Sequence, residues 1–172
     1  MDVFDPVHLI LIVSFILLQV AFQMKSRRKM LSFKFSSDIL TTTYYALIGG
    51  FAGSAGAAIA VVGGFVQLVT PDTKLKQTLP LRIGIAVLLS VVGSFVLARD
   101  AADYLPFLAV VASRFIELSH STFFMRLGFL ATALFWVVYN YANSFDVALW
   151  LAILTMIFIF VGFVRHETRL FR

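Results

Sequence analysis

The sequence contains no cysteine, which excludes a disulfide framework and thiolate chemistry. Charge is also scarce, because only 13% of the 172 residues are Asp, Glu, Lys or Arg, about half the share in a typical soluble domain. Acidic residues are the rarer sign, nine against 14 basic ones. Phosphate-binding loops, metal-ligand clusters and carboxylate dyads are absent from the sequence. We therefore expect no cofactor, no metal site and no enzymatic activity.

Hydrophobic residues make up 60% of the chain and form long uncharged runs, which is typical of a membrane protein. The runs are continuous rather than alternating, so they favour helices over an outer-membrane barrel. The basic residues behind the net charge of +5 flank these runs, which indicates membrane orientation and not nucleic-acid binding. The acidic start at Met1–Asp5 is unlike a secretory signal.

The apolar runs predict an all-α membrane protein with seven transmembrane helices in a single domain, residues 1–172. The expected spans are His8–Met24, Asp38–Gly50, a third from the glycine-rich turn at 49–56 to Thr70, Leu81–Ala98, Tyr104–His120, Phe123–Asn140 and Ala148–Val164. With seven spans, twelve of the 14 basic residues fall on one side of the membrane. The positive-inside rule then predicts a periplasmic N-terminus and a cytoplasmic C-terminus.

The two halves of the chain resemble each other, and Leu81–Ala98 has no counterpart. A shift of 94 positions aligns Leu11 with Leu105, Phe35 with Phe129, Leu40 with Leu134, Tyr45 with Tyr139 and Phe51 with Phe145. We therefore expect three-helix repeats at residues 8–70 and 104–165, joined by a linker helix at 81–98. Three spans, one linker and three spans make a parallel repeat about an axis along the membrane normal.

Several short segments carry a family resemblance: Phe22-Gln23, Lys25–Leu31, Tyr44–Gly50 and Trp136–Asn140. Together they resemble the YgjV-like family of bacterial inner-membrane proteins over nearly the whole chain, which implies that location. The three-one-three plan is more remotely similar to SWEET sugar transporters and PQ-loop proteins. Those proteins have Pro-Gln where this chain has Phe22-Gln23 and Ile116-Glu117, which argues against a proline hinge and against sugar as the substrate.

Arg114 and Glu117 form the sharpest candidate site. They lie three residues apart, hence on one helix face, and Arg114 is ~15 Å from the outer end of its expected span. Charges at that depth usually face a bundle interior or a wet cavity. Either the pair is a gate or substrate contact that meets the other half, or Arg114 snorkels to the cytoplasmic interface and Glu117 neutralises it.

An aromatic and amide group is the second candidate. Trp136, Tyr139 and Asn140 share one helix face, and Tyr45 matches Tyr139 in the first half. Such a wall suits a polar neutral ligand, but Trp and Tyr also serve as anchors at membrane interfaces.

Three further polar residues have two interpretations each. Gln19 and Gln23 lie one helical turn apart and either line a central path or form hydrogen bonds between helices. Asp38 is expected to be the N-cap of the second span, with Ser36 or Ser37 as rivals for that role, and a proton-titrating carboxylate is the alternative.

The leading functional prediction is a small transporter of a polar solute that works by rocking of the two halves. The alternative is a non-transporting membrane scaffold or a partner-binding subunit. The expected partner is the lipid bilayer. A small polar solute and a second copy of the chain are candidate partners, and nucleic acid is excluded. A polar cavity between the halves would favour transport, and a fully packed interface would favour the scaffold.

Overall fold

The computed structural model describes residues 5–74, 77–116 and 122–167. In these ranges the chain forms seven α-helices, two short 3-10 turns and no strands. The α-helices are α1 (Pro6–Gln23), α2 (Arg27–Leu47), α3 (Phe51–Val69), α4 (Leu79–Leu97), α5 (Leu105–Ile116), α6 (Thr122–Ala142) and α7 (Asp146–Glu167). The 3-10 turns are η1 (Asp72–Lys74) and η2 (Ala101–Tyr104). The expectation of an all-α protein is confirmed.

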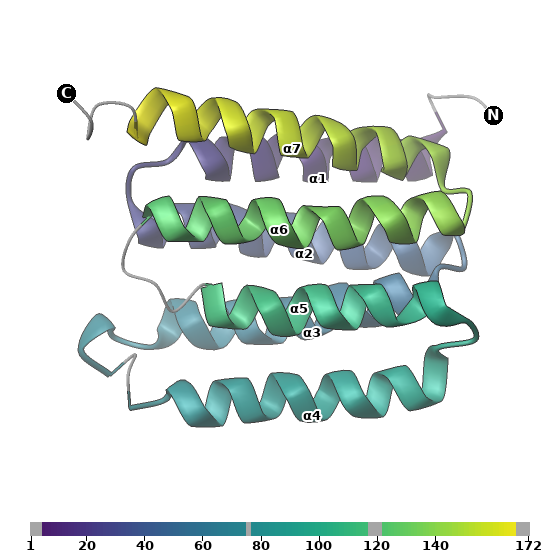
Figure 1. The fold of residues 1–172 in the computed structure, drawn as a ribbon, viewed down its shortest axis with the longest axis horizontal. Helices are drawn as coiled ribbons and strands as arrows, with labels where there is room; N and C mark the ends of the chain where they lie inside the picture. Colours follow the sequence, from purple (N-terminus) through teal and green to yellow (C-terminus); the bar gives the residue numbers. More distant parts are fainter. Residues whose placement is uncertain (1–4, 75–76, 117–121, 168–172) are drawn as a thin grey trace.

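The helices form two layers of three, with α4 at one side (Figure 1). One layer holds α1, α2 and α3, and the other holds α7, α6 and α5 in the same spatial order. The layers meet where α1 packs against α7 and α3 packs against α5, and α4 packs against both α3 and α5. Between these two contacts, α2 and α6 face each other across the middle of the molecule.

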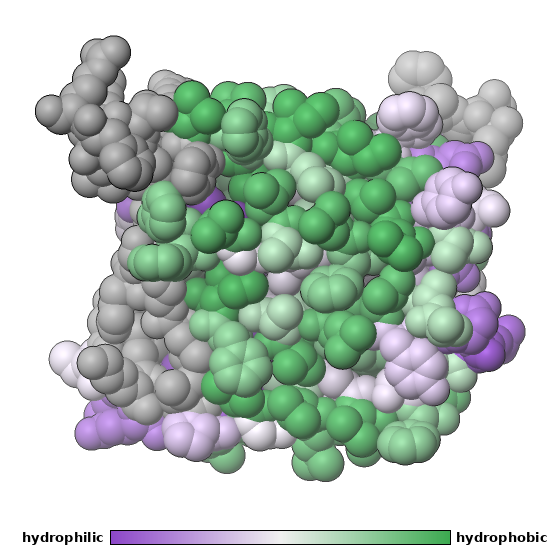
Figure 2. Space-filling view, in the orientation of Figure 1, coloured by the Kyte–Doolittle hydropathy of each residue, from purple (hydrophilic) through white to green (hydrophobic). Residues whose placement is uncertain are grey.

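The outer surface of the helices is largely apolar, as expected for a protein in a lipid bilayer. Within the described ranges, four helices are long and apolar enough to cross a membrane: Pro6–Gln23, Phe51–Val69, Pro80–Leu97 and Phe123–Ala142. A shorter apolar stretch covers Asp146–Gly162 in α7. Figure 2 shows hydrophobic residues across the middle of the visible face and hydrophilic residues towards the helix ends. The protein is therefore a membrane protein with several apolar helices.

The start of α2 corrects one sequence expectation. We expected the second span to begin at Asp38, but α2 already begins at Arg27. The N-cap role predicted for Asp38 is therefore wrong. The reason is that Lys, Arg, Met and Leu are good helix formers, so the basic stretch extends the helix by about three turns. Asp38 consequently lies in mid-helix, ~16 Å from the start of α2 at 1.5 Å per residue.

The glycine-rich segment contains a shorter turn than its composition indicates. Gly49 has a φ of 78° and leads directly into α3, so the reversal takes only the residues between Leu47 and Phe51. Gly53 and Gly56 are part of α3, where they are buried. Their role is close packing, since a Cβ on Gly56 would lie 2.8 Å from the Cβ of Pro106 in α5.

Candidate binding cavity between the helix layers

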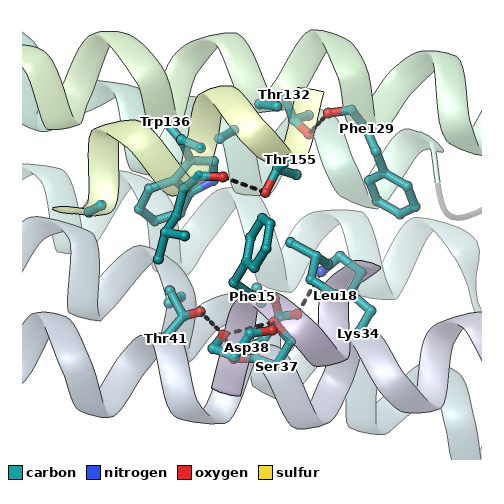
Figure 3. A pocket seen from close by; sticks show the side chains of 18 of the residues that line it. Phe15, Leu18, Lys34, Ser37, Asp38, Thr41, Phe129, Thr132, Trp136 and Thr155 are labelled. Atoms are coloured by element: carbon teal, nitrogen blue, oxygen red, sulfur yellow. Dashed lines mark hydrogen bonds and ion pairs between the residues drawn. The ribbon is translucent and has the colours of Figure 1, made fainter. Parts of the chain in front are cut away.

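A cavity of about 150 Å³ lies between the two layers. It is lined by residues from all six layer helices, and Figure 3 shows α2 on one side with α6 and α7 on the other. Its polar lining residues are Ser14, Lys34, Ser37, Asp38, Thr41, Tyr45, Ser113, Thr132, Trp136, Asn140 and Thr155. The rest of the wall is aliphatic or aromatic. Such a mixture of apolar walls and a few placed polar groups is typical of a small-molecule site.

An ion pair on α2 is the most polar feature of the cavity. The ammonium Nζ of Lys34 lies 2.6 Å from Oδ2 of Asp38, and the two side chains are only 11% and 16% exposed. The same ammonium lies 5.7 Å from the ring centroid of Phe129 on α6, within cation–π range. Charges inside a membrane protein are costly and usually mark functional sites. We missed this pair because Lys34 was interpreted as a loop charge, although its spacing of four from Asp38 was a signal.

Hydroxyl groups hold α1 against α2 beside the ion pair. Oγ of Ser14 lies 2.9 Å from the Oγ of Ser37 and 2.7 Å from Oγ1 of Thr41. The Ser37 hydroxyl also donates to the carbonyl of Ser14 at 2.9 Å. On the opposite side, the Thr132 hydroxyl donates to a carbonyl of its own helix, α6. The α2 wall therefore carries two neighbouring polar groups, the ion pair and the hydroxyl cluster (Figure 3).

One end of the cavity is closed where the α2–α3 and α6–α7 turns lie, and we call this the turn end. The hydroxyl of Tyr45 donates to Oδ1 of Asn140 at 2.7 Å, which joins α2 to α6. Tyr45 also stacks on Trp136 at 5.4 Å between ring centroids. Tyr139 does not line the cavity; its hydroxyl accepts from the backbone N–H of Gly53 at 3.0 Å. That N–H lies in the first turn of α3, where backbone N–H groups have no acceptor within their own helix.

The opposite end, where α1 joins α2 and α6 begins, we call the basic end. Arg126 of α6 is 1% exposed and donates from Nε to the carbonyl of Phe22 at 3.2 Å and from Nη2 to the carbonyl of Met24 at 3.3 Å. These carbonyls lie at the C-terminus of α1, where helices leave acceptors unsatisfied and favour cations. Met30 and Met125 are fully buried in the same apolar cluster as Phe22. The sequence analysis had treated Arg126 only as an orientation charge.

Arg114 lies outside the cavity. It is 4% exposed, passes over Gly63 of α3, and shares a small void with Gln67 and Arg82. Its Nη2 also lies 3.3 Å from the hydroxyl of Ser113. The structure thus brings Arg114 to α3 and α4. Glu117, its expected partner, lies outside the described residues.

The two glutamines do not line the cavity either. Gln19 donates from Nε2 to the hydroxyl of Thr155 at 3.1 Å, which joins α1 to α7. The Gln23 amide lies against Gly162 of α7, where an added Cβ would be 3.2 Å from its Nε2. Of the predicted ligand residues, Tyr45, Trp136 and Asn140 line the cavity.

Among the described residues, no group of three His, Asp or Glu side chains is close enough to hold a metal ion. The comparisons with known proteins agree with the membrane architecture. The family model Imp-YgjV, described as a bacterial inner membrane protein, matches residues 7–169. No curated protein and no solved structure matches the chain.

Proposed function

Because the chain belongs to the Imp-YgjV family of bacterial inner membrane proteins, we propose that it is a small transporter that carries a polar solute across this membrane. The observation that carries the proposal is the cavity lined by all six layer helices, with an ion pair and several hydroxyl groups in its otherwise apolar walls. A scaffold needs no such cavity. If the protein were only a scaffold, apolar side chains in place of the ion pair would give a more stable core, because a buried ion pair is seldom favourable in itself. The position of the cavity between two helix layers suits alternating access.

We propose further that the two layers are parallel repeats, residues 8–70 and 104–165, with 81–98 as the linker. The turns after α2 and α6 support this. The N–H of Gly50 donates to the carbonyl of Tyr45 at 2.8 Å, and the N–H of Phe145 donates to the carbonyl of Asn140 at 2.9 Å. In each turn the residue before the donor has a positive φ, 78° and 56° respectively. The same C-terminal motif thus recurs 95 positions later.

The spatial order of the helices supports the same relation. Rotation by half a turn about an axis parallel to the helices brings α1 onto α5, α2 onto α6 and α3 onto α7 (Figure 1). Such an axis lies along the membrane normal if the helices span the bilayer. In this proposal all seven helices cross the membrane, with the N-terminus in the periplasm and the C-terminus in the cytoplasm.

Transport by rocking requires each end of the cavity to open in turn. Opening the turn end breaks the contact between Tyr45 and Asn140, and opening the basic end withdraws Arg126 from the C-terminus of α1. Both contacts join helices of opposite layers, so each is lost when the layers separate at that end. The contacts at the other end then serve as the hinge.

Single cysteines test this proposal cleanly, because the chain has none of its own. Thr132→Cys places a thiol in the cavity, and Leu134→Cys on the same helix is the matched control, since Leu134 is 51% exposed on the outer surface. A membrane-impermeant maleimide is applied to vesicles of either orientation. We expect the cavity thiol to react from both sides and the control thiol from neither, because a thiol in hydrocarbon does not ionise to the reactive thiolate.

Labelling of Thr132→Cys from neither side would support the scaffold or partner-binding subunit instead. Labelling from one side only would show a vestibule that does not alternate. Uptake of a panel of small polar metabolites by proteoliposomes then identifies the solute.

A further inference from the structure

The charge of the cavity restricts its ligand. Among the described residues that line it, Lys34 and Asp38 are the charged ones, and their 2.6 Å pair carries no net charge. A singly charged ligand would add an uncompensated charge to a poorly solvated space, which is costly. A ligand without net charge avoids this cost. The cavity therefore favours a neutral solute or a zwitterion.

The volume restricts the ligand further. A cavity of about 150 Å³ is comparable to one that holds benzene, with about six non-hydrogen atoms. It is smaller than the ~300–1,000 Å³ of sites for drug-sized molecules. A hexose or a nucleoside is too large for this conformation.

The hydrogen bonds among the side chains that line the cavity favour a zwitterion over a small polyol as the ligand. The hydroxyls of Ser14, Ser37 and Thr41 already bond to one another, so a polyol would have to compete with a formed network. The ion pair can instead exchange partners: the Lys34 ammonium would bind an incoming carboxylate, and the Asp38 carboxylate would bind an incoming ammonium. Each charge-assisted bond lost is replaced by another of the same kind.

Building on the proposed transport function, we propose that the solute is a small α-amino acid in its zwitterionic form, of the size of glycine, alanine or serine. Its carboxylate binds Nζ of Lys34 and its ammonium binds the carboxylate of Asp38. The aromatic faces of Phe15, Phe129 and Trp136, which line the same space, close around the small side chain. Leucine and phenylalanine bind more weakly because their side chains exceed the cavity.

Binding to the purified protein in nanodiscs tests the ligand class, with radiolabelled alanine as the probe. Propionate carries the carboxylate alone, ethylamine carries the ammonium alone, and glycerol carries neither. We expect each of the three to compete for the site at least about tenfold more weakly than unlabelled alanine, because each lacks one or both charge-assisted bonds.

The double variant Lys34→Gln with Asp38→Asn tests the residues. It removes both charges of the pair at once, so neither Lys34 nor Asp38 is left charged without the other. We therefore expect it to fold and to bind alanine at least about tenfold more weakly. Lys29→Gln is the matched control, because Lys29 is an exposed charge on the same helix, and it should bind alanine as the unchanged protein does.

Alanine binding that survives the double variant, or competition by glycerol equal to that by alanine, would overturn the inference. Uptake by proteoliposomes tests the transport proposal separately from the proposal that the ligand is a zwitterion. Uptake of another solute without alanine binding refutes only the zwitterion. Alanine binding without uptake refutes only transport. The absence of both binding and uptake refutes both proposals.

Discussion

The two ends of the cavity are closed by different chemistry. At the turn end, neutral groups meet: a tyrosine hydroxyl bonds to an amide oxygen, and rings stack beside it. At the basic end, a buried guanidinium bonds to two backbone carbonyls, and the apolar cluster that contains Phe22 also holds Met30 and Met125. A bond to a charged group is worth roughly twice a neutral bond. The comparison therefore suggests that the basic end is the more firmly closed.

Two glycines at the turn end lie against aromatic rings. At the turn end a Cβ on Gly53 would lie 2.9 Å from the ring of Tyr139, and a Cβ on Gly50 would lie 3.1 Å from the ring of Tyr45. Rings thus approach the backbone closely there, which makes a rigid contact. Methionine at the basic end is flexible and adaptable, so the strength of that end depends on Arg126. Substitutions at both ends can test this contrast.

The largest effect is expected from Arg126→Ala. It removes two charge-assisted bonds to the end of α1 and leaves a void in a fully buried position, so we expect a loss of ~3 kcal/mol in the free energy of unfolding. Thermal unfolding in detergent measures the change. Arg28→Ala is the control, because Arg28 is exposed. Equal stability of the two variants would show that the guanidinium does not close the basic end.

Tyr139→Phe should cost less, about 1–2 kcal/mol, because it leaves the buried N–H of Gly53 without its acceptor. Tyr141→Phe is the matched control on the same helix, since Tyr141 is 74% exposed, and it should change stability by under about 0.5 kcal/mol. Unfolding curves of the two variants are compared with the unchanged protein. A loss of ~3 kcal/mol for Tyr139→Phe would place the stronger closure at the turn end.

Tyr45→Phe should cost ~1 kcal/mol, since it removes the donor to Asn140. A double-mutant cycle with Asn140→Leu should give a coupling energy of ~1 kcal/mol between the two positions. Additive effects would mean that the two side chains act independently and do not link the layers. In the labelling assay, Tyr45→Phe should increase the reaction of Thr132→Cys from the side of the turn end.

The smallest effects should come from the two turns. Gly49 has a φ of 78° and Ser144 a φ of 56°, a region in which residues other than glycine are strained. We expect Gly49→Ala to lower stability by ~1 kcal/mol and Ser144→Gly to raise it by less than about 1 kcal/mol. The same unfolding assay measures both. Changes of the same sign would contradict the equivalence of the turns.

Local signals in the sequence predicted part of the candidate site. Tyr45, Trp136 and Asn140 were selected because aromatic and amide groups share a helix face, and they line the cavity. Lys34 was missed, and Asp38 was assigned to an N-cap, because a run of basic residues before a serine pair was interpreted as a loop. Arg114 was selected for its depth, but depth does not specify which neighbour a side chain meets.

The sequence by itself determined the all-α membrane class and the family, because hydropathy and short motifs are properties of the chain alone. It also determined most helix positions to within a few residues. Only the tertiary structure decided that α2 faces α6, that Lys34 and Asp38 lie in a cavity, and that Arg126 reaches the end of α1. The physical reason is that helices in lipid pack through close contacts and polar bonds rather than through a hydrophobic pattern. Two helices of similar hydropathy can therefore meet in many ways, and side-chain shape selects one.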